Sequence, residues 1–398
     1  MKKGRGRTPT LLLPFFVMKK IDAYVCGMVL CAFALIPPMK TDLTAPVSWW
    51  PWMVLTSGFA GVYLLFVPSS WFTRTFALWV WFASFFSVAP FISFTAYIFF
   101  ILGCCFHTLC RSIKDFSPVF RMLKGLMLFY SMLLAVQVMR KDTLLNFGGV
   151  MECYGPVGQH MQSASFAVIL GASLAPLNPV FSLFAVPVSV VCNAAGGFAS
   201  AAAGLGVWLY QTRAKKFAFS VSAVLLSVFL FWIITSGKLK ENTTNDISRV
   251  KVWTRTVQLS LSRPVTGWGV GTYRYIFPTL GKVGGTGEFG EPDTFGSLPW
   301  KAAHNCWLQI MFETGVVGFV MVVGYFLFLF ARLRRLLSRA LYRNKAAGCL
   351  CGLVMVSVNM SIHFPTRQIS ALPLLIFFLA YCESFVIHSE RAVTHGSG

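Results

Sequence analysis

Acidic side chains are scarce in this sequence. Its 398 residues include 13 Asp and Glu against 34 Lys and Arg, and charged residues make up only 12% of the chain while hydrophobic residues make up 56%. A chain of this size with so few polar side chains cannot cover a soluble globular surface. The composition therefore places the protein in a lipid bilayer, as an all-α polytopic membrane protein.

The excess of positive charge does not indicate nucleic acid. The net charge is +21, but the Lys and Arg residues lie in short clusters between apolar runs and are not gathered on one soluble surface. Most of the 11 Cys residues lie inside the apolar runs, and none has the spacing of zinc ligands. We therefore expect no nucleic-acid partner, no disulfide framework and no metal site.

The N-terminus resembles the start of a signal peptide. Basic residues 2–7 precede an apolar run at 11–17, but Pro14 interrupts this run and no small-residue cleavage site precedes Lys19. We expect that the segment is not cleaved, and Met18 is an alternative start that N-terminal mass spectrometry would reveal.

The apolar runs predict about twelve spans, and the first five are each near the length of about 20 residues that crosses the hydrocarbon. Several of the four between residues 161 and 236 are short and rich in Gly, Ala or Pro, as in tightly packed bundles. The predicted spans are 21–36, 52–67, 72–88, 91–109, 122–139, 161–177, 180–192, 198–210, 217–236, 306–331, 346–364 and 369–387.

Basic residues in the connections set the orientation. With the N-terminus inside the cell, the inner connections collect most of the Lys and Arg residues, and the long connection 237–303 lies outside. Both termini are then cytoplasmic. The chain divides into a membrane bundle of about nine helices at 1–236, an outer loop at 237–303 and a C-terminal group of three helices at 304–398.

The outer loop is basic, contrary to the rule that the rest of the chain follows. Between residues 248 and 277 it has no acidic residue, and it holds Arg249, Lys251, Arg255, Arg263 and Arg274. This pattern predicts an anion site, although a solvated surface or contact with lipid headgroups explains the charge alone equally well.

A helix is predicted from a cap at Asn245 or Asp246 to Pro264. Residues 247, 250, 253, 257 and 261 form its apolar face, and the basic residues lie opposite, so we expect an amphipathic helix on the outer surface. The turn at 267–271 holds Gly269 and Gly271, whose amides are predicted to approach phosphate oxygens. The Gly-rich stretch 282–296 is interpreted as a flap or linker.

His304 and Asn305 stand where the loop re-enters the membrane. A neutral imidazole accepts a proton at physiological pH, so His304 is a candidate base, although a histidine at a membrane boundary is more often structural. Glu313 lies about 13 Å further along the helix at 1.5 Å per residue, too far to orient His304. We expect Glu313 to pair with another helix, because an unpaired carboxylate in a membrane is costly.

The order and spacing of these residues match a known sequence motif. The motif Arg249-x-x-x-Trp253, Pro264-x-x-Gly267-x-Gly269-x-Gly271-x-Tyr273 and His304-Asn305-x-x-Leu308-Gln309-x-x-x-Glu313-x-Gly315-x-x-Gly318 resembles the O-antigen ligase and O-antigen polymerase family. The resemblance implies a bundle of about twelve helices in the bacterial inner membrane, with a long periplasmic loop between helices nine and ten. Members move a glycan from undecaprenyl pyrophosphate to a hydroxyl, without metal, nucleotide sugar or other cofactor.

The resemblance also implies roles. Arg249 would neutralise the pyrophosphate that leaves, with Arg255 and Arg274 as weaker candidates, and His304 would be the general base of an inverting transfer. Trp253, Asn305 and Glu313 would shape the site. The expected partners are an undecaprenyl-pyrophosphate-linked glycan, an acceptor that is lipid A–core or a second glycan, and membrane lipid.

One departure concerns a Ser-Arg pair that family members carry at the outer end of the seventh or eighth span. Residues 193–197 read Asn-Ala-Ala-Gly-Gly here, without a basic residue. Either another cation replaces the Arg or activity is altered. The residues on the correct side are Arg140, Lys141 and Arg367, with His363 as a further polar neighbour and Gln159-His160 as another outer pair.

Several functions remain open. A ligase, which we favour, uses lipid A–core as acceptor, a polymerase joins carrier-linked repeat units, and a protein-directed oligosaccharyltransferase is a third version. A lipid-linked glycan flippase or another transporter would also have about twelve spans. Two observations oppose a transporter: there is no internal repeat, and ionisable residues inside the spans, such as His107 and Glu383, are isolated in sequence.

Overall fold

The structure is a computed structural model that describes residues 69–140, 160–192, 194–211, 238–280, 302–363, 365–367 and 371–395. All regular structure in these ranges is helical. The predicted spans 21–36, 52–67 and 217–236 and the Gly-rich stretch 282–296 lie outside the described residues.

The helices match the remaining predicted spans closely. The helix that follows the outer loop, for example, was predicted from residue 306 and begins at Cys306. The elements are α3 (Trp71–Phe85), α4 (Pro90–Ser112), α5 (Ser117–Arg140), α6 (His160–Leu174), the 3-10 helix η2 (Pro179–Phe184), α7 (Ala185–Val191), α8 (Ala195–Gln211), α10 (Lys238–Ser262), α11 (Tyr273–Leu280), α12 (Cys306–Leu336), α13 (Arg343–Ile362), the 3-10 helix η3 (Pro365–Arg367) and α14 (Leu372–His395).

Five of the described helices are long and apolar enough to cross a membrane: α4, α5, α12, α13 and α14. Their outward positions carry large apolar side chains, for example Phe91 and Leu128, which are 57% and 64% exposed. Such side chains suit contact with lipid tails. The chain is therefore a multi-pass membrane protein.

The predicted span 180–192 is a different structure. Residues 179–184 form η2 and residues 185–191 form the short helix α7. At 1.5–2.0 Å per residue the two together are shorter than the hydrocarbon thickness of about 30 Å. This segment packs against α6 and α8 inside the bundle instead of forming one crossing helix.

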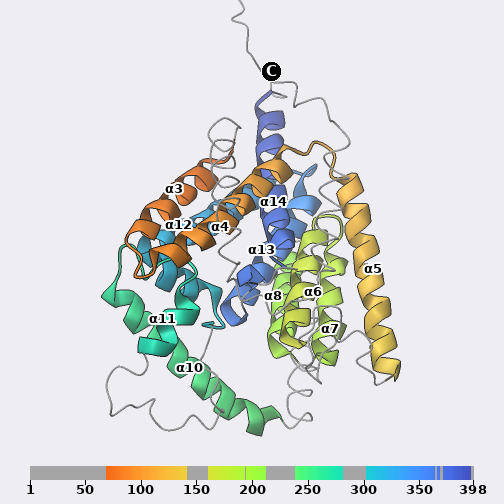
Figure 1. Ribbon diagram of the computed structural model, residues 1–398. Coiled ribbons are helices and arrows are strands. Elements are labelled where there is room, and N and C mark those ends of the chain that lie inside the picture. The colour runs from red at the N-terminus through yellow and green to blue at the C-terminus, as the bar shows by residue number, and fades with distance from the viewer. Residues whose placement is uncertain are drawn as a thin grey trace, which may run out of the picture.

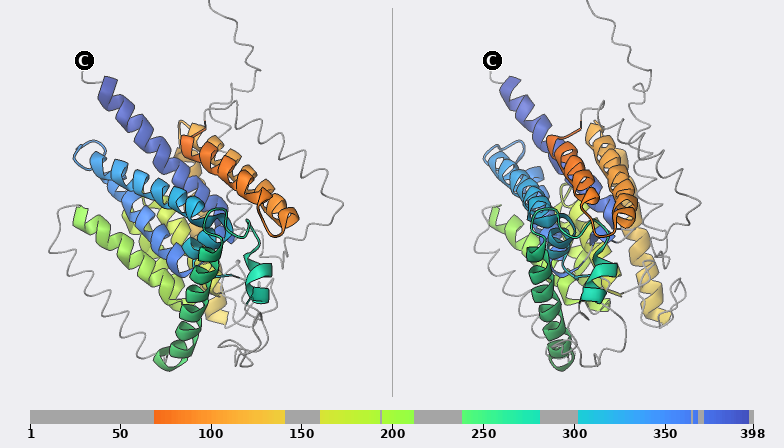
Figure 2. Two further views of the ribbon diagram at one scale, coloured as in Figure 1. Left: turned by 90° about the vertical axis from the view of Figure 1, so that its left-hand side faces the viewer. Right: turned by 60° about the vertical axis from the view of Figure 1, so that its left-hand side comes forward.

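Helix α13 lies in the bundle between α6, α8 and α12 (Figures 1 and 2). Small residues allow this close packing. A side-chain carbon at Gly348 would collide with the carbonyl oxygen of Ala175, and one at Gly352 would lie 2.7 Å from the carbonyl oxygen of Ala172. The expectation that the Gly- and Ala-rich segments form a tightly packed bundle is confirmed for α6 and α8, which both pack on α13.

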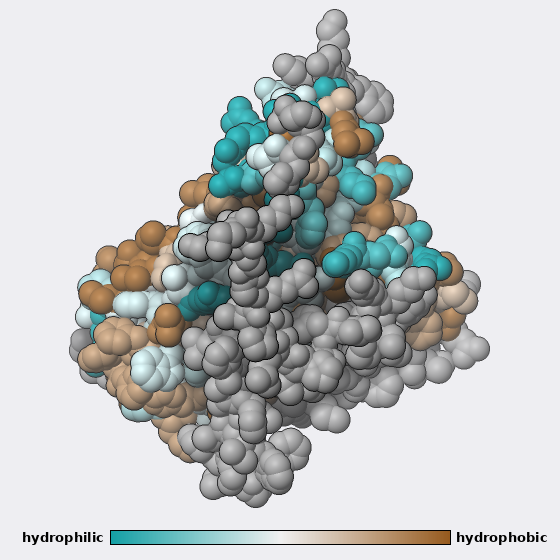
Figure 3. Space-filling view, turned by 90° about the horizontal axis from the view of Figure 1, so that it is seen from above, coloured by the Kyte–Doolittle hydropathy of each residue, from teal (hydrophilic) through white to brown (hydrophobic). Residues whose placement is uncertain are grey.

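The two ends of the bundle differ. Helices α10 and α11 lie at one end, and the connection from α12 to α13 lies near the end of α14 at the other (Figures 1 and 2). Viewed from the α14 end, hydrophilic residues gather over the middle of the described surface, and hydrophobic residues lie at the sides (Figure 3). The exposed residues Arg334, Arg335, Arg339 and Lys345 belong to this α12–α13 region.

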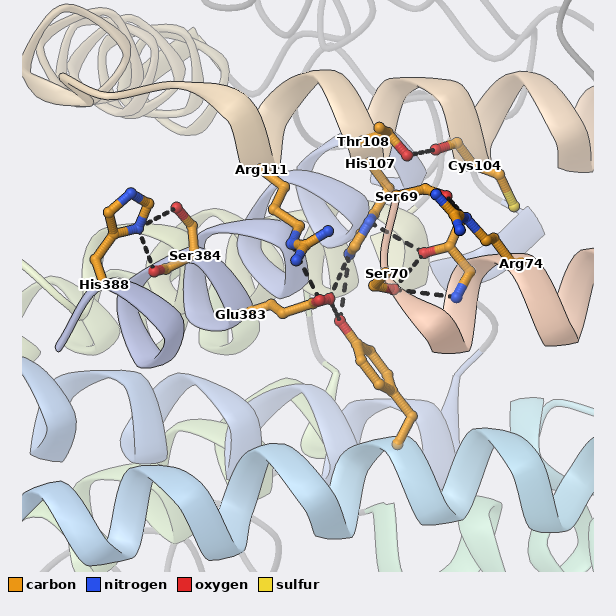
Figure 4. A network of polar contacts seen from close by, with 12 residues as sticks. Ser69, Ser70, Arg74, Cys104, His107, Thr108, Arg111, Glu383, Ser384 and His388 are labelled. Atoms are coloured by element: carbon orange, nitrogen blue, oxygen red, sulfur yellow. Dashed lines mark hydrogen bonds and ion pairs between the residues drawn. The ribbon is translucent and has the colours of Figure 1, made fainter. Parts of the chain in front are cut away.

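A buried polar network joins four helices in the half of the bundle away from α10. Arg111 of α4 contacts Glu383 of α14 at 3.1 Å, and Tyr325 of α12 donates a hydrogen bond to Glu383 at 3.0 Å. His107 lies 3.6 Å from the same carboxylate and 3.4 Å from Thr73 of α3. Arg111, His107 and Glu383 point toward one another (Figure 4).

This network corrects the expectation that His107 and Glu383 are isolated. They are far apart in sequence, but helix packing brings them together with a cation and a hydroxyl donor. A buried charge needs such partners, so the arrangement fits a structural role. It nevertheless removes one of the two sequence arguments against a transporter.

Removing the carboxylate in Glu383→Ala is expected to lower the free energy of unfolding by about 3 kcal/mol, because the largely buried Arg111, 22% exposed, and Tyr325 lose their buried partner. Thermal unfolding in detergent measures this. The matched control is Glu390→Ala on the same helix, whose pair with Arg332 is 34% exposed on both sides. Its effect should stay below about 1 kcal/mol, and equal effects of the two variants would contradict the assignment.

Candidate functional site

Helix α10 supports the site, but it rests on the bundle with a different face from the predicted one. Val252, Thr256 and Leu259 are buried, whereas Val250 and Leu261 are 55% and 60% exposed. The predicted end of this helix before Pro264 is confirmed, but its predicted cap at Asn245 or Asp246 was wrong, because α10 begins at Lys238, and its predicted contact face was wrong as well. The exposed apolar side chains leave a second stripe that is suited to a lipid interface.

Two side chains of α10 hold the chain on either side of residues 281–301. Trp253 donates a hydrogen bond from Nε1 to the carbonyl oxygen of Ala303 at 2.8 Å. Arg255 donates to the carbonyl oxygen of Leu280, at the end of α11, at 3.4 Å. Trp253 therefore positions the residue directly before His304.

His304 has an unusual backbone. Its φ is +51°, and it is the only non-glycine residue with positive φ in the described part of the chain. A left-handed conformation costs a residue with a side chain roughly 1–2 kcal/mol, and strain of this kind collects at functional sites. Asn305 follows it and caps α12, since its side chain accepts a hydrogen bond from the amide of Leu308 at 3.1 Å.

Burial lowers the pKa of His304 from 6.5 to about 4, and the positive charge of Arg249 is the second cause. The imidazole is therefore neutral near pH 7 and able to accept a proton. The positive charge of Arg249 on α10 therefore acts on the imidazole of His304, which directly precedes the cap of α12. A joint catalytic role of the two residues stays a prediction.

The Gly-rich turn lies against a break in α12. Gly315 has φ +72° and ψ 179°, which interrupts the helix and exposes backbone groups on both sides of it. The turn satisfies them: the amides of Trp268 and Gly269 donate to the carbonyl oxygens of Phe312 and Glu313, at 2.9 and 3.1 Å. On the far side of the break, the amide of Val316 donates to Pro264 at 2.7 Å.

The α3–α4 hairpin holds the other side of this turn. The hydroxyls of Ser87 and Ser93 donate to the carbonyl oxygens of Trp268 and Val270, at 3.2 and 3.1 Å. Trp79 of α3 donates to Thr314 of α12 at 3.0 Å. Sequence reasoning missed these contacts, because serines in a helix connection carry no signal of a partner so distant in sequence.

Gly269 and Gly271 have a different role from the predicted one. Both have positive φ, so the turn itself is confirmed. The Gly269 amide, however, donates to the α12 backbone, and the Gly271 amide donates to the Glu313 carboxylate at 2.9 Å. These donors are used to hold the turn on α12, and we do not retain them as phosphate ligands.

Glu313 was predicted to pair with another helix, and that pairing stays a prediction. Its two carboxylate oxygens accept from the Gly271 amide and from Nε2 of Gln309, at 2.9 and 3.0 Å. These two partners lie in the Gly-rich turn and in its own helix. Glu313 thus joins the turn to the first half of α12.

The other predicted cations contact nearby groups. The Arg274 guanidinium lies 5.3 Å from the ring centre of Tyr275, and Arg263 lies 4.8 Å from that of Trp268. Arg255 also contacts Gln258 on its own helix. The charge of Arg249 acts on His304, and the contributions of Arg249, Arg255 and Arg274 to anion binding stay predictions.

His363 lies at the junction of α8, α12 and α13. A side-chain carbon at Gly196 would lie 2.6 Å from its Nε2, and Cys306 Sγ lies 3.5 Å from its carbonyl oxygen. This places His363 beside the segment that lacks the Ser-Arg pair and beside the start of α12. The side chains of Arg140, Lys141, Gln159, His160 and Arg367 lie outside the described part.

Comparison with known proteins supports this site. The model of a family described as O-antigen ligase matches residues 180–323, a range that includes Arg249, His304 and the break at Gly315. No curated protein matches the chain. The family match confirms the resemblance that the motif indicated. Together with the apolar helices, it supports an activity of the O-antigen ligase or polymerase type in a multi-pass membrane protein.

A side chain at position 315 should separate the Gly-rich turn from the break in α12. Gly315→Ala places a carbon against the carbonyl oxygen of Val265 at a positive φ, so we expect a loss of about 1–3 kcal/mol or more in stability. Glycan transfer should fall with it. Gly324→Ala is the matched control on α12, since nothing lies within 4 Å of its added carbon. It should be neutral or stabilising, and similar losses from the two variants would contradict the role of the break.

Proposed function

We propose that this protein is an inverting, metal-independent glycosyltransferase of the bacterial inner membrane. It moves a glycan from undecaprenyl pyrophosphate to a hydroxyl of lipid A–core, with its site facing the periplasm and both termini in the cytoplasm. The observation that carries the proposal is the held position of His304: it has a φ of +51° directly before the cap of α12, Trp253 fixes the preceding residue, and burial and the charge of Arg249 lower the pKa of its imidazole. The match to the O-antigen ligase family supports it.

The proposed reaction uses the two residues in one step. His304 removes the proton of the acceptor hydroxyl while that oxygen attacks the anomeric carbon of the donor. The bond from this carbon to the pyrophosphate oxygen breaks, and the configuration inverts because attack comes from the opposite side. The base ends the step protonated, and the carrier leaves as undecaprenyl pyrophosphate.

Arg249 stabilises the charge that develops on the leaving pyrophosphate. A guanidinium presents two donors to phosphate oxygens and keeps its charge at every physiological pH. A preorganised donor of this kind contributes about 3–4 kcal/mol to the transition state. Arg255 and Arg274 are proposed as secondary contacts to the same anion, and Trp253 and Asn305 as the residues that shape the site.

Replacing Arg249 or His304 with Ala should abolish transfer while membrane insertion stays normal. His304→Gly separates the loss of the base from a change in stability, because glycine adopts a φ of +51° without strain and still lacks the imidazole. It should be as inactive as His304→Ala and at least as stable. Transfer is measured on gels with purified protein in proteoliposomes, and normal transfer by any of these variants would refute the assigned roles.

The acceptor distinguishes the ligase from its alternatives. Proteoliposomes would receive undecaprenyl-pyrophosphate-linked glycan with or without lipid A–core. Glycan on lipid A–core establishes a ligase, and longer carrier-linked chains in its absence establish a polymerase. Movement of the lipid-linked glycan across the bilayer without transfer would instead establish a flippase.

The lowered pKa of His304 predicts an unusual pH profile. A base must be neutral, so kcat/KM should stay level from pH 8 to pH 5 and fall as the pH drops through about 4, where His304 of the free enzyme takes up a proton. A bound pyrophosphate favours the imidazolium, so the acid limb of kcat should lie at higher pH. An acid limb of kcat/KM near 6.5, the ordinary pKa of histidine, would contradict the environment described for His304.

A further inference from the structure

Gln309 is a motif residue without a role in the proposed transfer. It lies on the second turn of α12, and its backbone amide donates to the carbonyl oxygen of Asn305 at 3.1 Å. Its side chain is only 6% exposed. The amide group is therefore buried within about 6 Å along the helix axis of the cap that follows His304.

The orientation of this amide is fixed by its neighbour. Both oxygens of Glu313 act as acceptors, one for the Gly271 amide and one for Gln309. A carboxylate that already accepts from a backbone amide offers Gln309 only an acceptor, so the NH2 group must face Glu313. The carbonyl oxygen Oε1 of Gln309 consequently faces away from Glu313.

This oxygen is buried, and no donor in the described part of the chain lies within hydrogen-bond distance of it. Buried side-chain oxygens in proteins nearly always accept a hydrogen bond. The missing partner must bring a hydrogen. A sugar hydroxyl brings one, whereas a fully ionised pyrophosphate brings only acceptor oxygens.

We propose that Gln309 Oε1 accepts a hydrogen bond from a sugar hydroxyl of a glycan bound at this site. Gln309 is then a specificity residue that distinguishes glycan from bare carrier lipid, and Glu313 is the positioning residue that turns its oxygen away from the carboxylate. This inference rests on the proposed function. The hydroxyl belongs to the carrier-linked glycan or to the acceptor glycan, which separate binding measurements distinguish.

The first test uses Gln309→Met, which keeps the length of the side chain and removes its polar atoms. Binding of three ligands is followed by tryptophan fluorescence in detergent: undecaprenyl-pyrophosphate-linked glycan, lipid A–core and glycan-free undecaprenyl pyrophosphate. The Kd of one glycan ligand should rise roughly tenfold, the value of about one neutral hydrogen bond. The Kd of the glycan-free carrier should stay unchanged.

The second test turns the side-chain amide of Gln309 over without removing it. In Glu313→Gln the new side chain must keep its oxygen toward the Gly271 amide, so its NH2 group faces Gln309. The amide of Gln309 then turns over, so that its oxygen faces the NH2 group of the new side chain and its own NH2 group faces the ligand. The same glycan ligand should bind roughly tenfold more weakly, as it does to Gln309→Met.

Thr314→Val is the matched control. It removes a buried hydroxyl from the next turn of α12 that donates within the helix to Ile310 at 2.7 Å, and it should leave all three Kd values unchanged. Unchanged glycan binding in Gln309→Met or Glu313→Gln, or an equal loss for the glycan-free carrier, overturns the inference. A wild-type protein that binds these ligands but transfers no glycan refutes the proposed function separately.

Discussion

The break in α12 is the constraint on which the site depends. Backbone amides and carbonyls at membrane depth must find partners inside the protein, because lipid tails offer none. Gly315 frees such groups in the middle of an apolar helix, and the turn at 264–271 supplies their hydrogen bonds. The outer loop is therefore part of the helix packing, and α12 could not hold this shape without it.

The two halves of α12 are held by separate sets of contacts. The first half carries Asn305, Gln309 and Glu313 and is fixed by the turn and by α10. The second half carries Tyr325, which belongs to the buried network around Glu383. A network at one end and a backbone junction at the other keep the start of the helix, with His304, in a defined place.

Local signals in the sequence predicted local structure well. Asn305 marked the start of α12 and Pro264 marked the end of α10, because caps and prolines act on their own neighbours. The motif also paired His304 with Arg249 before any contact was known. The contact face of α10 was wrong because its residues form two apolar stripes, around Val250 and around Val252, and only the tertiary partner selects between them.

The features that sequence reasoning missed all depend on residues distant in the chain. Nothing near Gly315 distinguishes a helix break from a glycine that permits close packing, since the difference lies in the carbonyl of Val265. His107 and Glu383 look isolated because their helices are far apart in sequence. The oxygen of Gln309 gains its direction only when Glu313 is seen to accept from Gly271.

The attachment of Leu280 and Ala303 to one helix has a consequence for engineering. Arg255 and Trp253 lie two positions apart on α10 and hold the chain immediately before and after residues 281–301. The entropy of closing a loop grows only slowly with its length once its ends are fixed. An epitope tag inserted between these anchors would leave both hydrogen bonds to α10 in place, so the backbone next to His304 would keep its position. This makes the segment between the anchors an attachment point for labelling the protein.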